Sequence, residues 1–180
     1  YSVGLKSDNT VVAAGWNDYG QCNVASWTGV IKIAASNNRT LGVKADGTLL
    51  GVGSSPYGEL AYIVDWTGIV EACTFDGGIV GRKSDGTVVT AGPFVPAAVA
   101  SWTNIVQLSG GTYHVLGLKS DGTVVSARTG GGNVGDVTSW TNVIKVAAGN
   151  EYSLGLLADG SIVATGTNTG GRLDFPTKIN

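Results

Sequence analysis

The sequence is poor in the residues that most enzymes use and poor in charge. Its 180 residues include no methionine, one histidine, two cysteines and four prolines, and only 13% of them are charged. Glycine contributes 29 residues, and 43% of the chain is apolar. This composition argues against a bundle of long helices and against disorder. The length allows one sizeable core, so we expect a single domain over residues 1–180.

The charge balance and the hydropathy pattern exclude further classes. Eleven basic and thirteen acidic side chains give a net charge of −2, so no positive surface for nucleic acid is expected. No apolar run reaches the eighteen residues of a membrane span, and we expect no membrane insertion. The lack of methionine and of a signal-peptide pattern favours a processed or excised piece of a longer protein.

The sequence supplies no recognisable catalytic, cofactor or metal site. His114 is the only histidine, so no triad can be assembled, and a structural role is expected for it. Cys22 and Cys73 lie 51 residues apart without metal-ligand spacing. We expect a buried thiol at Cys73 and leave the redox state of both cysteines open. The acidic residues show no pairing typical of a glycosidase.

The strongest signal is an internal repeat. Five Asp-Gly or Asp-Asn turns recur at spacings of 38, 39, 36 and 38 residues, beginning at Asp8, Asp46, Asp85, Asp121 and Asp159. Four tryptophans keep the same period and are expected to pack between repeats: Trp27, Trp66, Trp102 and Trp140. For the aspartates, the recurrence predicts a structural turn role.

The sequence of each repeat predicts four short strands. The sequence Trp-Thr precedes a first strand, a second strand ends at the Asp-Gly pair, a third strand follows, and a glycine-rich loop leads to a last short strand, as at residues 19–24. An Asp-Gly pair between β-rich runs is the signature of a two-residue hairpin. We therefore predict an all-β β-propeller of about five blades with four antiparallel strands each, either by itself or as part of a larger ring.

Two further recurrences favour radial packing. The first strands end in small residues, as expected where strands converge on an axis. The second strands carry a glycine in the same register, which predicts close approach of other atoms there: Gly4, Gly42, Gly81, Gly117 and Gly155.

Residues 140–149, 117–125 and 19–24 resemble the short bacterial-type repeats of the regulator-of-chromosome-condensation family, and the resemblance extends over the whole chain. It implies a propeller fold, commonly seven-bladed, in a family that includes nucleotide-exchange factors and secreted β-lactamase inhibitors. The second strands depart from the family pattern, because only His114 keeps the histidine at their start. The other repeats have Tyr1, Arg39, Gly78 and Tyr152.

Four aromatic residues are the candidate partner-binding residues. Trp16, Tyr19, Tyr57 and Phe94 all follow a third strand, which would bring them to one face of a radial array. Aromatic clusters of this kind anchor protein interfaces and sugar sites. For Tyr19 and Tyr57, the alternative is packing between blades as part of a repeated Tyr-Gly element.

The sequence thus favours a non-enzymatic, extracellular or cell-surface binding or assembly module for a protein or a glycan. Alternatives are an inhibitor of a secreted hydrolase, an exchange-factor-like propeller and an enzyme with an unidentified acid pair. Asn38 begins a glycosylation sequon. The strand at residues 1–6 lacks a first-strand neighbour in this sequence, which predicts either a longer parent array that supplies it or self-association through this edge.

Overall fold

The computed structural model describes residues 1–36, 38–130 and 134–175. Its strands form one two-stranded sheet and four three-stranded sheets, all antiparallel. In chain order the sheets are β1 (Ser2–Leu5) with β2 (Val11–Ala14); β3 (Val30–Ser36), β4 (Arg39–Lys44) and β5 (Leu49–Gly53); β6 (Ile69–Phe75), β7 (Gly78–Lys83) and β8 (Val88–Ala91); β9 (Ile105–Gly110), β10 (His114–Lys119) and β11 (Val124–Arg128); β12 (Val143–Ala148), β13 (Tyr152–Leu157) and β14 (Ile162–Gly166).

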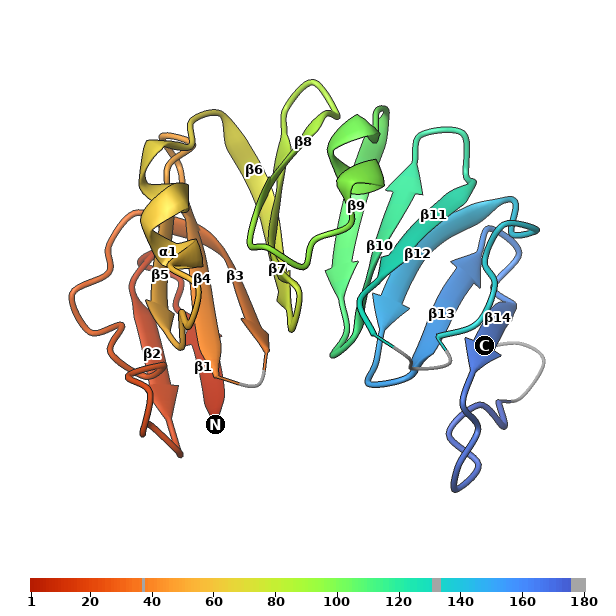
Figure 1. The fold of residues 1–180 in the computed structure, drawn as a ribbon, viewed down its shortest axis with the longest axis horizontal. Helices are drawn as coiled ribbons and strands as arrows, with labels where there is room; N and C mark the ends of the chain where they lie inside the picture. The colour runs from red at the N-terminus through yellow and green to blue at the C-terminus, as the bar shows by residue number, and fades with distance from the viewer. Residues whose placement is uncertain (37, 131–133, 176–180) are drawn as a thin grey trace.

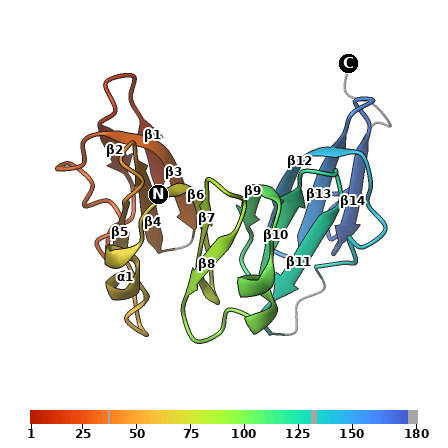
Figure 2. The same cartoon turned by 90° about the horizontal axis from the view of Figure 1, so that it is seen from above.

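The five sheets stand side by side in chain order and form an open arc (Figures 1 and 2). In each three-stranded sheet the central strand pairs with the strand before it and the strand after it. This is the blade arrangement of a β-propeller, and it confirms the predicted all-β class and the repeat assignment. Among the described helices, none is both long enough and apolar enough to cross a membrane.

The prediction of a fourth strand in every blade was wrong for the described residues. The segment after the third strand forms turns in the first repeat, the helices α1 (Glu59–Tyr62) and η1 (Ile63–Asp65) in the second, and η2 (Ala97–Ser101) in the third. Gly20 and Gly58 have φ angles of 78° and 76°, which a strand does not allow. The segments after the third strands of the first four repeats instead insert one nearly inaccessible apolar side chain each into the core: Val24, Ile63, Val99 and Val137.

The hairpin turn also differs from the predicted two-residue type. Lys44 N donates to Thr48 O at 2.9 Å, and Gly47 N donates to Lys44 O at 3.0 Å, so the loop has three residues. Asp46 Oδ1 accepts hydrogen bonds from Thr48 N at 3.0 Å and Thr48 Oγ1 at 2.6 Å. The same pair of bonds recurs at Asp8, Asp85, Asp121 and Asp159, which confirms the structural role of the turn aspartates.

Each repeated tryptophan ring packs against one of the repeated glycines, and we call this contact the Trp-Gly unit. A Cβ atom added at Gly42 would lie 2.8 Å from the ring of Trp27, and Gly81, Gly117 and Gly155 face Trp66, Trp102 and Trp140 in the same way. Trp27 shares an apolar cluster with Val11 of the preceding sheet and Val30 of its own sheet. The tryptophans therefore fill the space between blades, as predicted.

The first strands of neighbouring blades approach closely near the inner side of the arc. Gly110 has no side chain, and a Cβ atom added there would collide with the carbonyl oxygen of Thr74 in the preceding blade. Polar side chains form hydrogen bonds with backbone groups of the neighbouring first strand. Glu71 Oε2 accepts from Leu108 N at 3.0 Å, and the Gln107 side chain makes two hydrogen bonds with the backbone of Val146. The predicted crowding of the first strands is confirmed.

Candidate binding site

The four candidate aromatics are half exposed and form two pairs. The exposed fractions are 48% for Trp16, 51% for Tyr19, 54% for Tyr57 and 52% for Phe94. Trp16 and Tyr19 meet edge to face with ring centroids 5.3 Å apart, and Tyr57 and Phe94 do so at 5.1 Å. The first pair comes from one segment after β2, whereas the second joins segments after β5 and β8. Their exposure argues against simple burial between blades.

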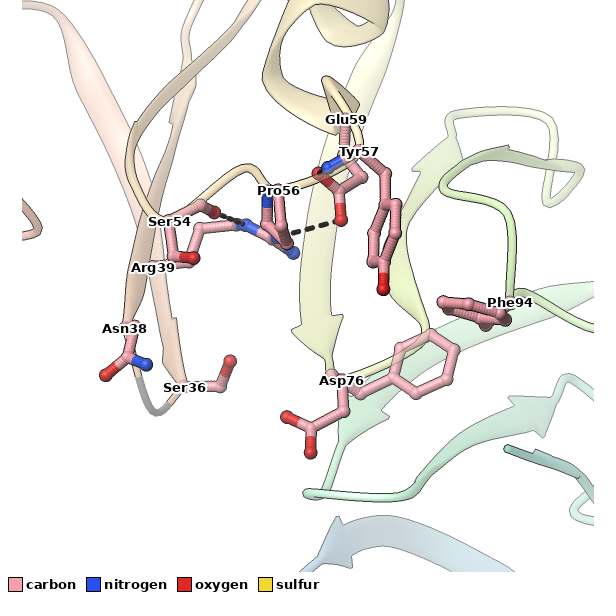
Figure 3. Close-up of a pocket in the computed structure, with 10 residues that line it drawn as sticks. Ser36, Asn38, Arg39, Ser54, Pro56, Tyr57, Glu59, Asp76 and Phe94 are labelled. Carbon is pink, nitrogen blue, oxygen red and sulfur yellow. Dashed lines mark hydrogen bonds and ion pairs between the residues drawn. The ribbon is translucent and has the colours of Figure 1, made fainter. Parts of the chain in front are cut away.

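A cavity of about 390 Å³ lies beside the second pair, where the ends of the second and third sheets meet (Figure 3). Four parts of the chain line it: the ends of β3 and β4 with Asn38, the segment after β5, the end of β6 with Asp76, and the segment after β8. Its lining includes Arg39, Glu59, Asp76 and the rings of Tyr57, Phe75 and Phe94.

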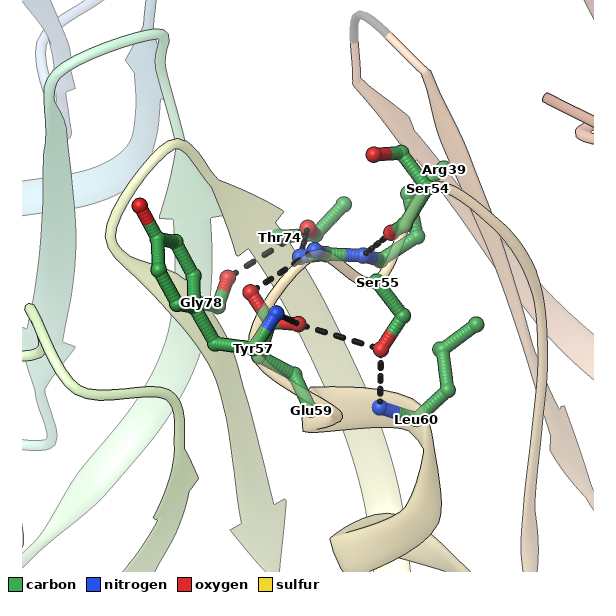
Figure 4. Close-up of polar contacts among 8 residues, drawn as sticks. All are labelled: Arg39, Ser54, Ser55, Tyr57, Glu59, Leu60, Thr74 and Gly78. Carbon is green, nitrogen blue, oxygen red and sulfur yellow. Dashed lines mark hydrogen bonds and ion pairs between the residues drawn. The ribbon is translucent and has the colours of Figure 1, made fainter.

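A buried ion pair forms one wall of this cavity (Figure 4). Arg39 Nη2 lies 3.2 Å from Glu59 Oε1, and the two side chains are 8% and 1% exposed. Arg39 Nε donates to Ser54 O at 2.9 Å, and Arg39 Nη1 donates to Thr74 Oγ1 at 3.0 Å. Every nitrogen of the guanidinium is thus used, and the side chain ties the second blade to the third.

Glu59 connects this ion pair to the aromatic pair. Its Oε2 accepts from Ser55 Oγ at 3.0 Å and from Tyr57 N at 3.2 Å. Burial alone raises the pKa of Glu59, but hydrogen bonds to the carboxylate and the charge of Arg39 outweigh this effect and lower the pKa below its ordinary value. Glu59 therefore stays ionised and fixes the backbone that carries the Tyr57 ring.

Sequence reasoning missed Arg39, Glu59 and Asp76 as members of a site. The available signal was that Arg39 replaces the family's histidine at the start of a second strand, a position that the structure buries. Asn38 of the sequon also lines the cavity, while Thr40 is inaccessible and donates to Gln21 O at 2.8 Å. Glycosylation of Asn38 stays a prediction.

The residues considered for catalysis lie apart from this cavity. His114 is inaccessible, and its Nε2 lies 3.0 Å from Ser153 Oγ of the next blade. Burial lowers the pKa of His114 to about 4 and raises the pKa of the nearly inaccessible Cys73 thiol. Across residues 1–36, 38–130 and 134–175, no cluster of three or more His, Cys, Asp or Glu side chains could hold a metal ion.

Residues 143–172 match the family model described as Regulator of chromosome condensation (RCC1) repeat. The comparison with curated proteins gives no match. Among solved structures, the chain is similar to the CRINKLY WD40 ectodomain of the Arabidopsis thaliana receptor kinase ACR4, with 17% identity, a TM-score of 0.70, and coverage of 92% of this chain and 62% of that one.

Two further solved structures are similar. Prp20p from Saccharomyces cerevisiae has 18% identity and a TM-score of 0.63, with coverage of 77% of this chain and 44% of that one. Human WBSCR16 has 19% identity and a TM-score of 0.68, with coverage of 86% and 55%. The chain thus spans about half of these proteins or somewhat more. The family match at residues 143–172 and the shared fold confirm that this chain resembles the RCC1-repeat propellers.

Proposed function

We propose that this chain is a non-enzymatic binding module that docks a protein partner at the cavity between its second and third blades. The observation that carries the proposal is the edge-to-face pair of Tyr57 and Phe94, which comes from two blades and stays half exposed beside a cavity. Large aromatic side chains next to a concave surface are the usual anchors of protein interfaces.

The contacts that hold the Tyr57 ring in place favour a binding role for the Tyr57–Phe94 pair. The Arg39–Glu59 ion pair is buried, each guanidinium nitrogen makes a hydrogen bond, and Glu59 holds the Tyr57 backbone. A rigid ring loses little conformational freedom when a partner covers it, so more of the contact energy remains for affinity.

The similar structures are compatible with this role. The Prp20p study concerns binding to Gsp1p and histones, and another solved structure shows yeast RCC1 bound by Kap60. The similar ACR4 structure is an ectodomain, and we propose the same placement, outside the cell or at its surface, for this chain.

The test is selection of peptides from a random phage-displayed library on the immobilised full chain. We expect enriched peptides whose binding is lost when Phe94 is replaced by serine. The matched control is Val64→Ser, because Val64 is 69% exposed on η1 and is not among the residues that line the cavity. A glycan array probed with the same three proteins distinguishes a sugar ligand.

The proposal fails if no peptide is enriched, or if Phe94→Ser and Val64→Ser bind the selected peptides equally well. Phe94-dependent binding of a glycan without any Phe94-dependent peptide would also overturn it, because the partner would then be a sugar. Circular dichroism should show the same fold for all three proteins, since both replaced side chains are largely exposed.

A further inference from the structure

A groove of about 560 Å³, which we call the aromatic groove, shares Tyr57 with the cavity described above. It lies between the helices that follow β5 and the end of β8, where α1 contacts β8. Seven residues line it: Tyr57, Tyr62, Trp66, Thr90, Ala91, Gly92 and Pro93. Because Tyr57 belongs to both the groove and the cavity, a ligand that covers this ring can extend from one into the other.

The aromatic rings that line the groove are accessible to a ligand. Tyr62 on α1 is 65% exposed, and Tyr57 is 54% exposed. Trp66 is half-buried, whereas the tryptophans at the same position of the other repeats are buried, with exposed fractions of 6%, 8% and 7% for Trp27, Trp102 and Trp140. The tryptophan between the second and third blades therefore keeps part of its surface open.

The lining determines which ligand chemistry fits. None of the seven lining residues is charged or carries a side-chain amide. A charged group would therefore lose its hydration without gaining a countercharge. A sugar has many hydroxyl donors, and the lining offers no carboxylate or amide oxygen to accept their hydrogen bonds. The groove thus favours an uncharged ligand with a mainly apolar surface.

Two donors in the lining favour a ligand with hydrogen-bond acceptors. Among the described residues, the hydroxyl group of Tyr62 and the indole Nε1–H of Trp66 have no hydrogen-bond partner. A proline-rich segment offers backbone carbonyls as acceptors and has few N–H donors to satisfy, because proline lacks that group. Its polyproline II helix packs against aromatic side chains and is already extended before it binds.

We propose that the aromatic groove binds a proline-rich segment of the partner in the polyproline II conformation, with prolines against Tyr57, Tyr62 and Trp66. The inference rests on the proposed function, which it deepens by giving the chemistry of a partner segment next to the cavity. Tyr62 lines the groove alone, whereas Phe94 lines the cavity alone, so the two sites are tested by different variants.

The test is an NMR titration of the full chain with an acetylated and amidated L-oligoproline of about nine residues, which forms three turns of polyproline II helix. The matched control is the same peptide of D-proline, which has the same composition and charge but the mirror-image helix. We expect the L-peptide to give saturable shifts of the Trp66 indole signal and of the amides of Tyr62, Thr90 and Gly92. The D-peptide should bind roughly fivefold more weakly or less.

Two variants with exposed side chains locate the contact. Tyr62→Ser should weaken binding of the L-peptide roughly fivefold or more, as for the loss of an aromatic anchor. Val64→Ser should leave it unchanged, because Val64 is 69% exposed on η1 and is not among the residues that line the groove. Equal binding of both peptides, equal effects of both variants, or shifts that do not include the Trp66 indole would overturn the inference.

Other occupants of the groove would give different results. The inference fails if cellohexaose shifts these signals and the L-peptide does not, because the ligand would then be a glycan. It also fails if only a rise in protein concentration shifts them, because the groove would then bind a second copy of the chain.

The outcomes remain distinct from those of the peptide selection. Phe94-dependent peptides in the selection, together with no binding of the L-oligoproline, would refute the groove inference while leaving the binding module intact. Tyr62-dependent binding of the L-oligoproline, without any Phe94-dependent peptide in the selection, would support the groove inference while refuting docking at the cavity.

Discussion

At the residue scale, the position at the start of the second strand has different roles in different blades. In three of the repeats, the residue at the start of the second strand, or the one just before it, places its side chain against the following blade. Tyr1 Oη accepts from Thr40 Oγ1 at 3.0 Å, Arg39 Nη1 donates to Thr74 Oγ1, and His114 Nε2 lies beside Ser153 Oγ. In these three repeats the position therefore connects neighbouring blades, and in the second blade it also supports the cavity.

His114 should make stability depend on pH between about 6.5 and 4. Burial favours its neutral form in the folded chain, so the unfolded chain binds the proton first as the pH falls. The free energy of unfolding should therefore decrease from pH 6.5 to 4, by up to roughly 3 kcal/mol, as measured by urea denaturation. His114→Gln should show a flatter profile in this window. Parallel profiles for the two proteins would contradict the assignment.

The Arg39–Glu59 pair should matter for stability as well as for the cavity. Glu59→Gln leaves a buried guanidinium without its countercharge and should lower the free energy of unfolding by about 3–5 kcal/mol. Replacing both residues by methionine removes the uncompensated charge and should recover part of this loss. Chemical denaturation of the three proteins measures both effects. A Glu59→Gln loss under about 1 kcal/mol would show that the pair is not buried as described.

At the element scale, the sequence predicted the periodic features and missed those that depend on contacts between repeats. The strands and the aspartate turns recur in all five described sheets, and the Trp-Gly packing recurs in four of them, so the repeat itself reveals these features. The ion pair of Arg39 and Glu59 occurs in one blade only, and its partners are 20 residues apart on different elements. No periodic signal marks such a pair.

The missing fourth strand has a similar explanation. Residues 19–24 contain strand-favouring residues, but Gly20 adopts a left-handed conformation with φ of 78°. Asn17 Oδ1 then accepts from Cys22 N at 2.6 Å and stabilises a compact turn. Side-chain hydrogen bonds of this kind compete with a strand ladder and are difficult to recognise from propensity. The sequence predicted only that Tyr57 and Phe94 lie on the same face. Their direct contact could not be predicted, because it depends on the conformations of the two loops.

The central-strand glycines provide a matched test of the Trp-Gly unit. Gly42→Ala places a methyl group 2.8 Å from the Trp27 ring and should lower the free energy of unfolding by about 1–3 kcal/mol. Gly4 occupies the equivalent position in β1, but its added Cβ would meet only Val12 at 3.4 Å. Gly4→Ala should therefore change stability by less than about 0.5 kcal/mol. Thermal or urea denaturation distinguishes them, and equal losses would contradict the packing unit.

At the scale of the whole molecule, the arc presents two open sheet faces. Among the described strands, β1 pairs only with β2, and Val12 on that sheet is 52% exposed. At the other end a cavity of about 260 Å³ is lined by Leu154, Leu156 and Ile162. The equivalent faces of inner blades are covered by the next blade, so the predicted self-association would join the two ends of separate copies.

We expect sedimentation velocity to show association that increases with protein concentration. Val12→Lys places a charge on the open β1–β2 face and should weaken the association, whereas Val64→Lys on the exposed η1 helix should leave it unchanged. A wild-type chain that remains monomeric at all concentrations would refute the predicted self-association.

The location of the binding surface is the central claim, and mapping a selected peptide onto the amide NMR spectrum of the whole chain tests it most directly. The account predicts that the perturbed amides cluster where the second and third blades meet, at residues 36, 38, 39, 54, 57, 59, 76 and 94, which border the cavity. Perturbations confined to the β1–β2 edge, or to the inner side of the arc around Glu71 and Gln107, would contradict it.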